Sequence, residues 1–345
     1  MIKPPKLQKG DKVALISLSW GGANAFPLRY EIGKKQIAQT LGLEPIETKY
    51  SQKSPEWLEK NPEARAEDLM NAFADPSIKA IFSIIGGDDS YKLIPFVDLN
   101  VITKNPKVFL GYSDTTTAHL MCYKAGLSSF YGPSVMTGLA DGGGILPYTV
   151  ASLQKTLFSN DPLDYIADNN APWSNTFTNW GDPDQENKRR AFFIPKPMKF
   201  LNSDKKSHGK LIGGCIETLI QLTETELWPD KEEFKEKILF LEISEDCKGL
   251  NDLKENLRYL KEAGIFSGIN GILFGKPSDS IEEKDHDVIS DGFSSYCRDE
   301  LNLDVPILCD ASFGHNDPVF IIPYGTNIII DPLNKQIIID ESAVI

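Results

Sequence analysis

Ser113 follows an apolar run of the chain after only two residues. The run Val108–Leu110 is typical of a buried strand, and Gly111 and Tyr112 lead from it into Ser113, Asp114 and three threonines. A serine at a tight turn between strand and helix exposes its hydroxyl, and the next backbone N–H can help to bind an oxyanion. The usual last glycine of the Gly-x-Ser-x-Gly motif is absent, and these residues would also cap a helix well. A nucleophile and a helix cap therefore both remain open.

A second polar turn follows another predicted strand. The sequence Gly86-Gly87-Asp88-Asp89 comes directly after the run KAIFSII. Glycine lets the main chain approach a substrate closely, so the backbone N–H groups here could bind a substrate carbonyl oxygen. The same residue types also form ordinary turns. The two interpretations are compatible, because an oxyanion hole is itself a turn.

A serine nucleophile needs a base, and the chain has only four histidines. We expect His119 to pack along the helix after Ser113, and we expect His208 and His286 to be solvated because their surroundings are polar. His315 lies in a Gly-His-Asn-Asp-Pro turn behind the predicted strand VPILCD, where a turn would fix an imidazole at a strand end. A simple capped loop explains that turn equally well.

Glu242 is the candidate carboxylate that would orient such a base. It interrupts the end of the apolar run ILFLEI, where a buried carboxylate is costly without a partner. Glu245 and Asp246 are expected to be solvated. Glu217 is the rival orienting group, although its place early in a helix is explained by the helix dipole alone.

These residues need a scaffold, and the N-terminal half predicts a parallel α/β sheet. Short apolar runs alternate with helical patterns, including a helix over 28–40 and another whose cap and first position are Asn61 and Pro62. Ligands of such sheets bind at the carboxyl ends of the strands, where both polar turns lie. The second half predicts mixed α and β elements. We expect domains over 1–160 and 209–345, joined by a connecting segment over 161–208.

Composition excludes several classes of protein. The formal net charge is -13 over 345 residues, which disfavours binding to nucleic acid. No apolar stretch is long enough to span a membrane, and the five scattered cysteines suggest neither a disulfide framework nor a zinc site. There is no HExxH motif and no close group of histidines and carboxylates, so we expect no metal and no cofactor. We expect a cytoplasmic protein.

The connecting segment carries aromatic and basic residues. Trp173, Phe177 and Trp180 could stack on a nucleobase, or they could pin the segment to the rest of the protein. Arg189 and Arg190 could bind a carboxylate or phosphate of a substrate, and exposed surface charge is an equally good explanation.

Taken in order, the motifs resemble the LD-carboxypeptidase family of serine peptidases, which includes the microcin C self-immunity peptidases. The resemblance spans essentially the whole chain. It rests on PPKLQKGDKVALISLS, IGGDDSYKLIPFVD, FLGYSDTT, GKLIGGCIETL, ILFLEISED and DASFGHNDP, with the closing IIIDESAV. The GGDDS form and the long connecting segment are more similar to the microcin C branch.

The resemblance implies a catalytic triad of Ser113 as nucleophile, His315 as general base and Glu242 as its orienting group. It implies an oxyanion hole made by the backbone N–H groups of Gly87 and Asp114. It also implies a flavodoxin-like N-terminal domain, a smaller mixed α/β C-terminal domain that carries the glutamate and the histidine, and a homodimer.

Substrate contacts are expected from Asp88, Trp180 and Arg190. Cys215 stands where the family pattern has asparagine, which puts in doubt the polar contact normally made there.

Three functions follow as hypotheses. The first is a peptidase that cleaves the amide of a peptidyl- or aminoacyl-nucleotide conjugate of the microcin C type, in detoxification or self-immunity. The second is an LD-carboxypeptidase that removes the terminal D-amino acid from muropeptides in cell-wall recycling. The third is a small-molecule binding protein without catalysis, in which the turn at Ser113 is only a helix cap.

Overall fold

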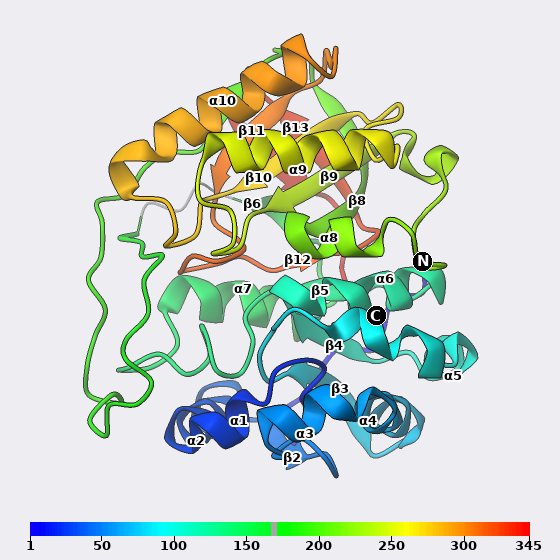
Figure 1. The fold of residues 1–345 in the computed structure, drawn as a ribbon, viewed down its shortest axis with the longest axis vertical. Helices are drawn as coiled ribbons and strands as arrows, with labels where there is room; N and C mark the ends of the chain where they lie inside the picture. The colour runs from blue at the N-terminus through cyan, green and yellow to red at the C-terminus, as the bar shows by residue number, and fades with distance from the viewer. Residues whose placement is uncertain (167–170) are drawn as a thin grey trace.

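Two β-sheets, one above the other in Figure 1, organise the protein. The structure is a computed structural model that describes residues 1–166 and 171–345. The six-stranded first sheet has the order β12-β5-β4-β3-β1-β2. Its strands are β1 Lys12–Ile16, β2 Glu44–Glu47, β3 Ile78–Ser83, β4 Val108–Gly111, β5 Phe130–Tyr131 and β12 Ile322–Pro323. All neighbouring strands are parallel except β12, which runs antiparallel to β5.

The order β2-β1-β3-β4-β5 is that of flavodoxin-like sheets, which confirms the predicted fold of the N-terminal part. Its helices are α1 Gly22–Ala25, α2 Pro27–Gln36, α3 Pro55–Lys60, α4 Pro62–Ala74, α5 Leu99–Lys104, α6 Thr116–Lys124 and α7 Pro147–Leu157. The helix predicted over 28–40 is split, because α2 passes into a π-helical turn over Ile37–Leu41. The helix predicted to begin at Pro62 does so.

The second sheet is mixed and eight-stranded, with the order β6-β14-β13-β8-β9-β10-β11-β7. Strands β8 to β11 are mutually parallel, and the flanking strands are antiparallel. The strands are β6 Asp164–Ile166, β7 Lys199–Leu201, β8 Ser207–Cys215, β9 Lys237–Glu242, β10 Gly271–Gly275, β11 Ile307–Ala311, β13 Asn327–Asp331 and β14 Gln336–Ile339. Its helices are α8 Ile216–Leu222, α9 Leu250–Glu262 and α10 His286–Asp299.

The two sheets do not divide the chain at one point. Strands β6 and β7 come from the segment that we expected to connect the domains, and β12 returns from the C-terminal part to pair with β5. The boundaries at residues 160 and 208 stay predictions.

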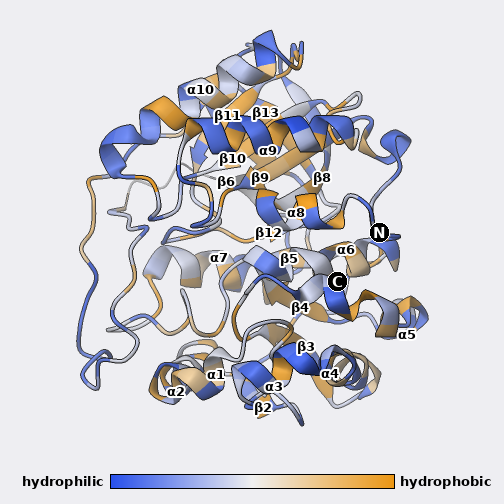
Figure 2. Ribbon diagram, in the orientation of Figure 1, coloured by the Kyte–Doolittle hydropathy of each residue, from blue (hydrophilic) through white to orange (hydrophobic). Residues whose placement is uncertain are grey.

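Apolar strands form the core of both sheets. The strands are among the most hydrophobic segments in Figure 2, whereas α9 and α10 alternate between hydrophilic and hydrophobic residues. Every residue of β4, β10 and β11 is buried. No helix among the described residues is long and apolar enough to cross a membrane.

Strand β8 of the second sheet lies close to the start of α6 in the first part. A Cβ atom added at Gly214 would lie 2.5 Å from Cγ2 of Thr116, so only glycine permits this approach. The Thr116 hydroxyl accepts a hydrogen bond from the Cys215 N–H at 3.1 Å and donates one to the Ser113 carbonyl at 2.7 Å. The turn that holds Ser113 is therefore tied directly to the second sheet.

Candidate active site

Ser113 lies in a strained turn at the carboxyl end of β4. Its φ of +62° lies in the left-handed region that residues other than glycine rarely adopt. Strain of this kind persists where the surroundings hold it, and it often marks functional sites. The 3-10 turn and the helix that follow have no side-chain cap. The geometry therefore does not favour the helix-cap interpretation of Ser113.

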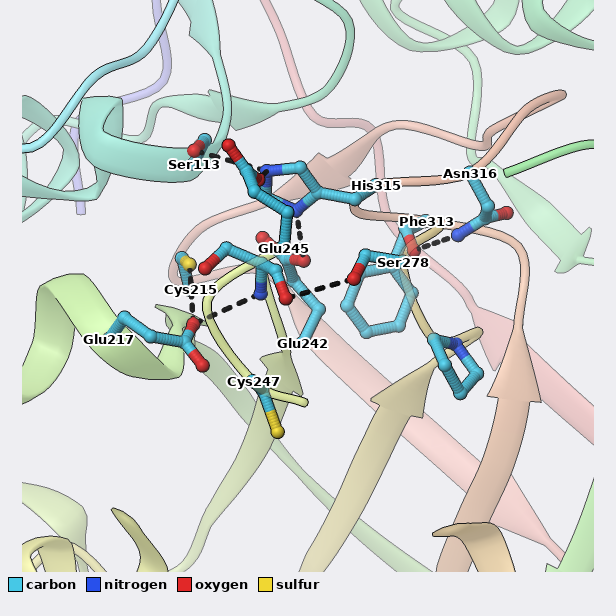
Figure 3. Close-up of polar contacts among 12 residues, drawn as sticks. Ser113, Cys215, Glu217, Glu242, Glu245, Cys247, Ser278, Phe313, His315 and Asn316 are labelled. Carbon is cyan, nitrogen blue, oxygen red and sulfur yellow. Dashed lines mark hydrogen bonds and ion pairs between the residues drawn. The ribbon is translucent and has the colours of Figure 1, made fainter. Parts of the chain in front are cut away.

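The structure brings the three residues of the predicted triad together (Figure 3). Nε2 of His315 lies 3.2 Å from Oγ of Ser113, and Nδ1 of His315 lies 2.6 Å from Oε2 of Glu242. Ser113 follows β4, Glu242 ends β9, and His315 lies in the loop after β11. The three side chains thus come from both sheets and form one line of hydrogen bonds. This arrangement orients a base toward a hydroxyl.

Glu242 rather than Glu217 orients the imidazole. The Glu242 side chain has no solvent exposure, and His315 is its ionic partner. Glu217 instead accepts hydrogen bonds from the Ser244 N–H at 3.0 Å and the Cys215 thiol at 3.1 Å (Figure 3). The exposed Glu245 places Oε2 3.7 Å from Nε2 of His315, on the same side as Ser113.

The electrostatics of the site act on His315. Burial by itself lowers the pKa of its imidazole. The neighbouring carboxylates of Glu242, Glu245 and Glu217 raise this pKa by more than burial lowers it, and the net value is about 9. An opposite charge within a few ångströms stabilises the protonated form.

The other histidines lie elsewhere. His119 is buried on α6, as expected, and its two ring nitrogens contact the Ser129 hydroxyl and the Gly111 carbonyl. His208 is exposed. The prediction that His286 is solvated is wrong: it is 1% exposed beneath the ring of Trp173, and burial lowers its pKa to about 4.

The two glycines after β3 allow the main chain to pass beside two serines, Ser113 at Gly86 and Ser19 at Gly87. A Cβ added at Gly86 would lie 3.0 Å from Oγ of Ser113, and one added at Gly87 would lie 2.2 Å from Oγ of Ser19. No hydrogen bond joins the N–H of Gly87 or Asp114 to an acceptor among the described residues. These are the two donors that the resemblance implied for an oxyanion hole.

A buried ion pair that was not predicted from the sequence supports this glycine turn. Arg65 on α4 donates to both carboxylate oxygens of Asp89, at 2.6 and 3.1 Å. The Ser19 hydroxyl donates to Asp89 and accepts from the N–H groups of Asp88 and Asp89. Bidentate contacts of this kind fix geometry as well as adding binding energy. The turn therefore does not depend on substrate for its shape.

Asp114 also has a structural side chain. Its carboxylate accepts from the N–H of Ser90 at 2.9 Å and from the Ser90 hydroxyl at 2.8 Å, and burial raises its pKa. The turn that holds Ser113 and the glycine turn are thus joined through Ser90.

A cavity of about 690 Å³ opens at Ser113 and His315. Its walls combine aromatic residues with carboxylates. The lining residues include Trp20, Phe26, Phe177, Trp180, Asp88, Glu245, Asp246 and Asp279. A small second hollow, which also reaches Ser113, is lined by Cys215 and Glu217 among others.

The aromatic residues of the connecting segment separate into two groups. Trp173 is 1% exposed and donates from Nε1 to the Ile194 carbonyl, so it pins the segment in place. Phe177 and Trp180 line the cavity, and Trp180 packs edge-on against Phe26. Much of the chain between residues 171 and 198 forms a long loop at the left of Figure 1, beside both parts of the molecule.

The predicted substrate residues differ in their positions. Asp88 and Trp180 line the cavity. Arg190 does not: its buried guanidinium contacts Asp141 at 3.0 Å and Asp317 at 2.9 Å. Two carboxylates already neutralise this arginine, so its geometry is that of a structural residue rather than of a substrate contact.

Cys215 is buried beside the site, and its thiol donates to Glu217. Burial raises the pKa of this thiol well above its usual range. Among the residues that the structure describes, no group of three or more histidines, cysteines and acids could hold a metal ion.

Comparisons with known proteins agree with this architecture. Residues 13–132 match the model of the LD-carboxypeptidase N-terminal domain, and residues 208–330 match that of the C-terminal domain. The chain is 28% identical to the microcin C7 self-immunity protein MccF of Escherichia coli, over 97% of this chain and 94% of that protein. It is 26% identical to a probable murein peptide carboxypeptidase of Bacillus subtilis, over 98% and 94% of the two chains.

Solved structures show the same likeness. An MccF-like protein from Streptococcus pneumoniae in complex with AMP superposes with a TM-score of 0.85 at 30% identity, covering 96% of this chain and 99% of that one. MccF in complex with aspartyl sulfamoyl adenosine gives a TM-score of 0.84 at 26% identity over the whole of both chains. With both domains matched and the fold shared throughout, the chain belongs to the LD-carboxypeptidase family of serine-type peptidases.

Proposed function

We propose that this serine peptidase hydrolyses the amide bond of aminoacyl- or peptidyl-nucleotide conjugates of the microcin C type, and so detoxifies them. The observation that carries the proposal is the hydrogen-bonded line Ser113–His315–Glu242, which opens into a cavity with aromatic walls. The line provides the chemistry, and the walls provide a surface for a flat base.

The reaction follows from the geometry. Nε2 of His315 takes the Ser113 proton as Oγ attacks the amide carbonyl carbon, and a C–O bond forms. The imidazolium then gives that proton to the amine nitrogen as the C–N bond breaks. Water then attacks the acyl carbon while His315 takes its proton. The C–Oγ bond breaks, the acid is released, and His315 returns the proton to Oγ of Ser113. Glu242 keeps its negative charge throughout and holds the imidazole.

The negative oxygen of each tetrahedral intermediate would accept from the N–H groups of Gly87 and Asp114. Both groups lack an acceptor among the described residues, and both belong to turns held by buried side chains. Each such donor typically contributes about 3 kcal/mol to the transition state.

The aromatic walls support a nucleoside in the cavity. Phe177 and Trp180 come from the connecting segment. Their rings form one cluster along the cavity with those of Trp20 and Phe26 from the first domain. Stacking of a base on an aromatic ring contributes roughly 1 to 3 kcal/mol. Structural neighbours bound to AMP and to aspartyl sulfamoyl adenosine support the same class of ligand.

The charge of the cavity limits which acyl groups the enzyme would accept. Asp88, Glu245, Asp246 and Asp279 line it, and no lysine or arginine does among the described residues. A negative acyl side chain would be repelled there. We therefore propose that neutral or cationic acyl groups are preferred over acidic ones.

The proposal also covers the location of the protein in the cell and its oligomeric state. The five cysteines are all free and buried, which is consistent with a reducing cytoplasm. A homodimer remains part of the proposal, on the resemblance alone.

The LD-carboxypeptidase function remains the second candidate, since a full-length relative carries the name murein peptide carboxypeptidase. The binding protein without catalysis is less favoured, because it gives no reason for an oriented imidazole at Ser113.

The function is tested with wild type and Ser113→Ala on two substrates, an aminoacyl-sulfamoyl adenosine and an LD-linked muropeptide tetrapeptide. We expect wild type to cleave the adenosine conjugate, and the variant to lose at least about a thousandfold in kcat because the nucleophile is gone. Mass spectrometry measures the products. Cleavage of the tetrapeptide alone would assign the protein to cell-wall recycling, and cleavage of neither would favour the binding protein.

The charge preference is tested with isosteric conjugates, aspartyl against asparaginyl and glutamyl against glutaminyl sulfamoyl adenosine. We expect kcat/KM to be about fivefold higher for each neutral member, as roughly 1 kcal/mol of repulsion implies. The difference should shrink as salt is added, since salt screens exposed charges. Equal rates within each pair at low salt would refute the preference.

The pH dependence tests His315. Because the neutral imidazole is the base and its pKa is raised to about 9, kcat/KM should increase as pH rises from 7 to 9. Glu245→Gln removes one of the carboxylates that raise this pKa, so the acid limb of the profile should move to lower pH. The exposed Glu255 on α9 supplies the control Glu255→Gln, for which we expect no movement. An identical limb in Glu245→Gln and wild type would contradict this account of His315.

A further inference from the structure

We propose that Tyr131 is a positioning residue of this active site, whose single hydroxyl holds the backbone of Ser113 and the carboxylate of Glu242 in register across the two sheets. The proposal rests on the nucleophilic role of Ser113 proposed above. Tyr131 lies in the short stretch SSFYG, where nothing in the sequence pointed to a role in chemistry.

The hydroxyl makes two hydrogen bonds at once. It donates to Oε1 of Glu242 at 2.5 Å and accepts from the N–H of Ser113 at 3.0 Å. Oε2 of Glu242 is the oxygen that His315 contacts. Tyr131 therefore contacts the carboxylate oxygen of Glu242 that is not bonded to the imidazole. Burial and the adjacent Glu242 raise the pKa of Tyr131 well above its usual range, so the hydroxyl keeps its proton.

The ring of Tyr131 cannot easily move away. Its strand β5 pairs with β4 on one side, where Gly111 lies opposite Tyr131, and with β12 on the other. The ring is fully buried against Phe240 of β9, with centroids 5.3 Å apart, and against His119 at 5.5 Å. Removing the hydroxyl alone would leave this packing in place.

The bond to Ser113 bears on the oxyanion hole. The Ser113 N–H is bonded to Tyr131, so it is not available to a substrate. The N–H groups left to bind the oxyanion are those of Asp114 and Gly87. The same bond supports the positive φ of Ser113, which needs a surrounding structure to hold it.

The bond to Glu242 bears on the proton of His315. When His315 is protonated, its charge balances that of the fully buried carboxylate. When His315 is neutral, Glu242 carries the only charge of the pair, and the Tyr131 hydroxyl then matters most. Loss of the hydroxyl therefore makes His315 harder to deprotonate. Other ionisable groups act on the pair from neighbouring elements: Cys215 on β8, Glu217 on α8, Glu245 after β9, Asp279 after β10 and Tyr112 after β4.

The test compares Tyr131→Phe with Tyr324→Phe. Tyr324 is a matched control, because it is also fully buried, stacks on His119 and donates its hydroxyl, but to the Gly213 carbonyl rather than to the triad. The readout is the rate at which a fluorophosphonate probe labels Ser113, measured by intact-protein mass spectrometry from pH 6 to 10. This readout does not require the natural substrate.

We expect Tyr131→Phe to react about 10 to 100 times more slowly than wild type, as the loss of a hydrogen bond to a charged group implies. Its acid limb should move up by roughly one pH unit. With a substrate that wild type cleaves, kcat should fall while KM stays within about twofold. Tyr324→Phe should lose thermal stability without moving the limb.

The Tyr131→Phe variant could instead keep the acid limb of the wild-type labelling profile and lose stability as Tyr324→Phe does. That result would show that the hydroxyl only stabilises the fold. Wild-type Ser113 that resists the probe at every pH and cleaves no substrate would overturn the proposed function, and the positioning role with it.

If Tyr131→Phe does not fold, 3-fluorotyrosine at position 131 makes the hydroxyl a stronger donor. The limb should then move to lower pH, and an unmoved limb refutes the proposal.

Discussion

The rest of the structure depends on one buried charge, the carboxylate of Glu242. A carboxylate without solvent exposure is costly unless both of its oxygens are paired. His315 and Tyr131 pair them, and each comes from a different part of the fold. The end of β9 must therefore meet the end of β5 and the loop after β11 in one place. The close approach of these three elements and the hydrogen-bonded line Ser113–His315–Glu242 both satisfy this constraint.

The opposite side of the site is held by a second buried charge. Asp89, paired with Arg65 and bonded to Ser19, fixes the glycine turn beside Ser113. The turn has glycine where it approaches Ser113, at Gly86, and where it packs on Ser19, at Gly87. Its backbone N–H groups therefore carry the donor role that we propose. Both sides of the candidate site are thus held by buried carboxylates, Glu242 and Asp89, that bond to residues from other elements of the fold. Such a site is preorganised before substrate arrives.

The residue types in the strand-end turns were predictable from the sequence, but the contacts between residues far apart in the chain were not. The flavodoxin-like order could be inferred because alternating strands and helices restrict the topology. Ser113 and His315 were identifiable as residues in strand-end turns, yet the residues alone left a helix cap and a capped loop open, and only the resemblance selected the triad. His286 looked solvated because its neighbours in sequence are polar, whereas the ring that covers it belongs to Trp173, more than a hundred residues earlier. Arg190 looked available because Asp141 and Asp317 are likewise distant. Tyr131 gave no signal, since an aromatic residue in an apolar strand normally belongs to the core.

The most direct test of the account is to trap the covalent intermediate. Wild-type protein is mixed with an asparaginyl sulfamoyl adenosine conjugate, quenched in acid within milliseconds to seconds, digested and mapped by mass spectrometry. The account predicts a transient acyl mass on the peptide that contains Ser113, which decays as the amino acid is released. Turnover of the conjugate with no acyl mass at any time, or with the acyl group on another residue, would contradict the central claim that Ser113 is the nucleophile.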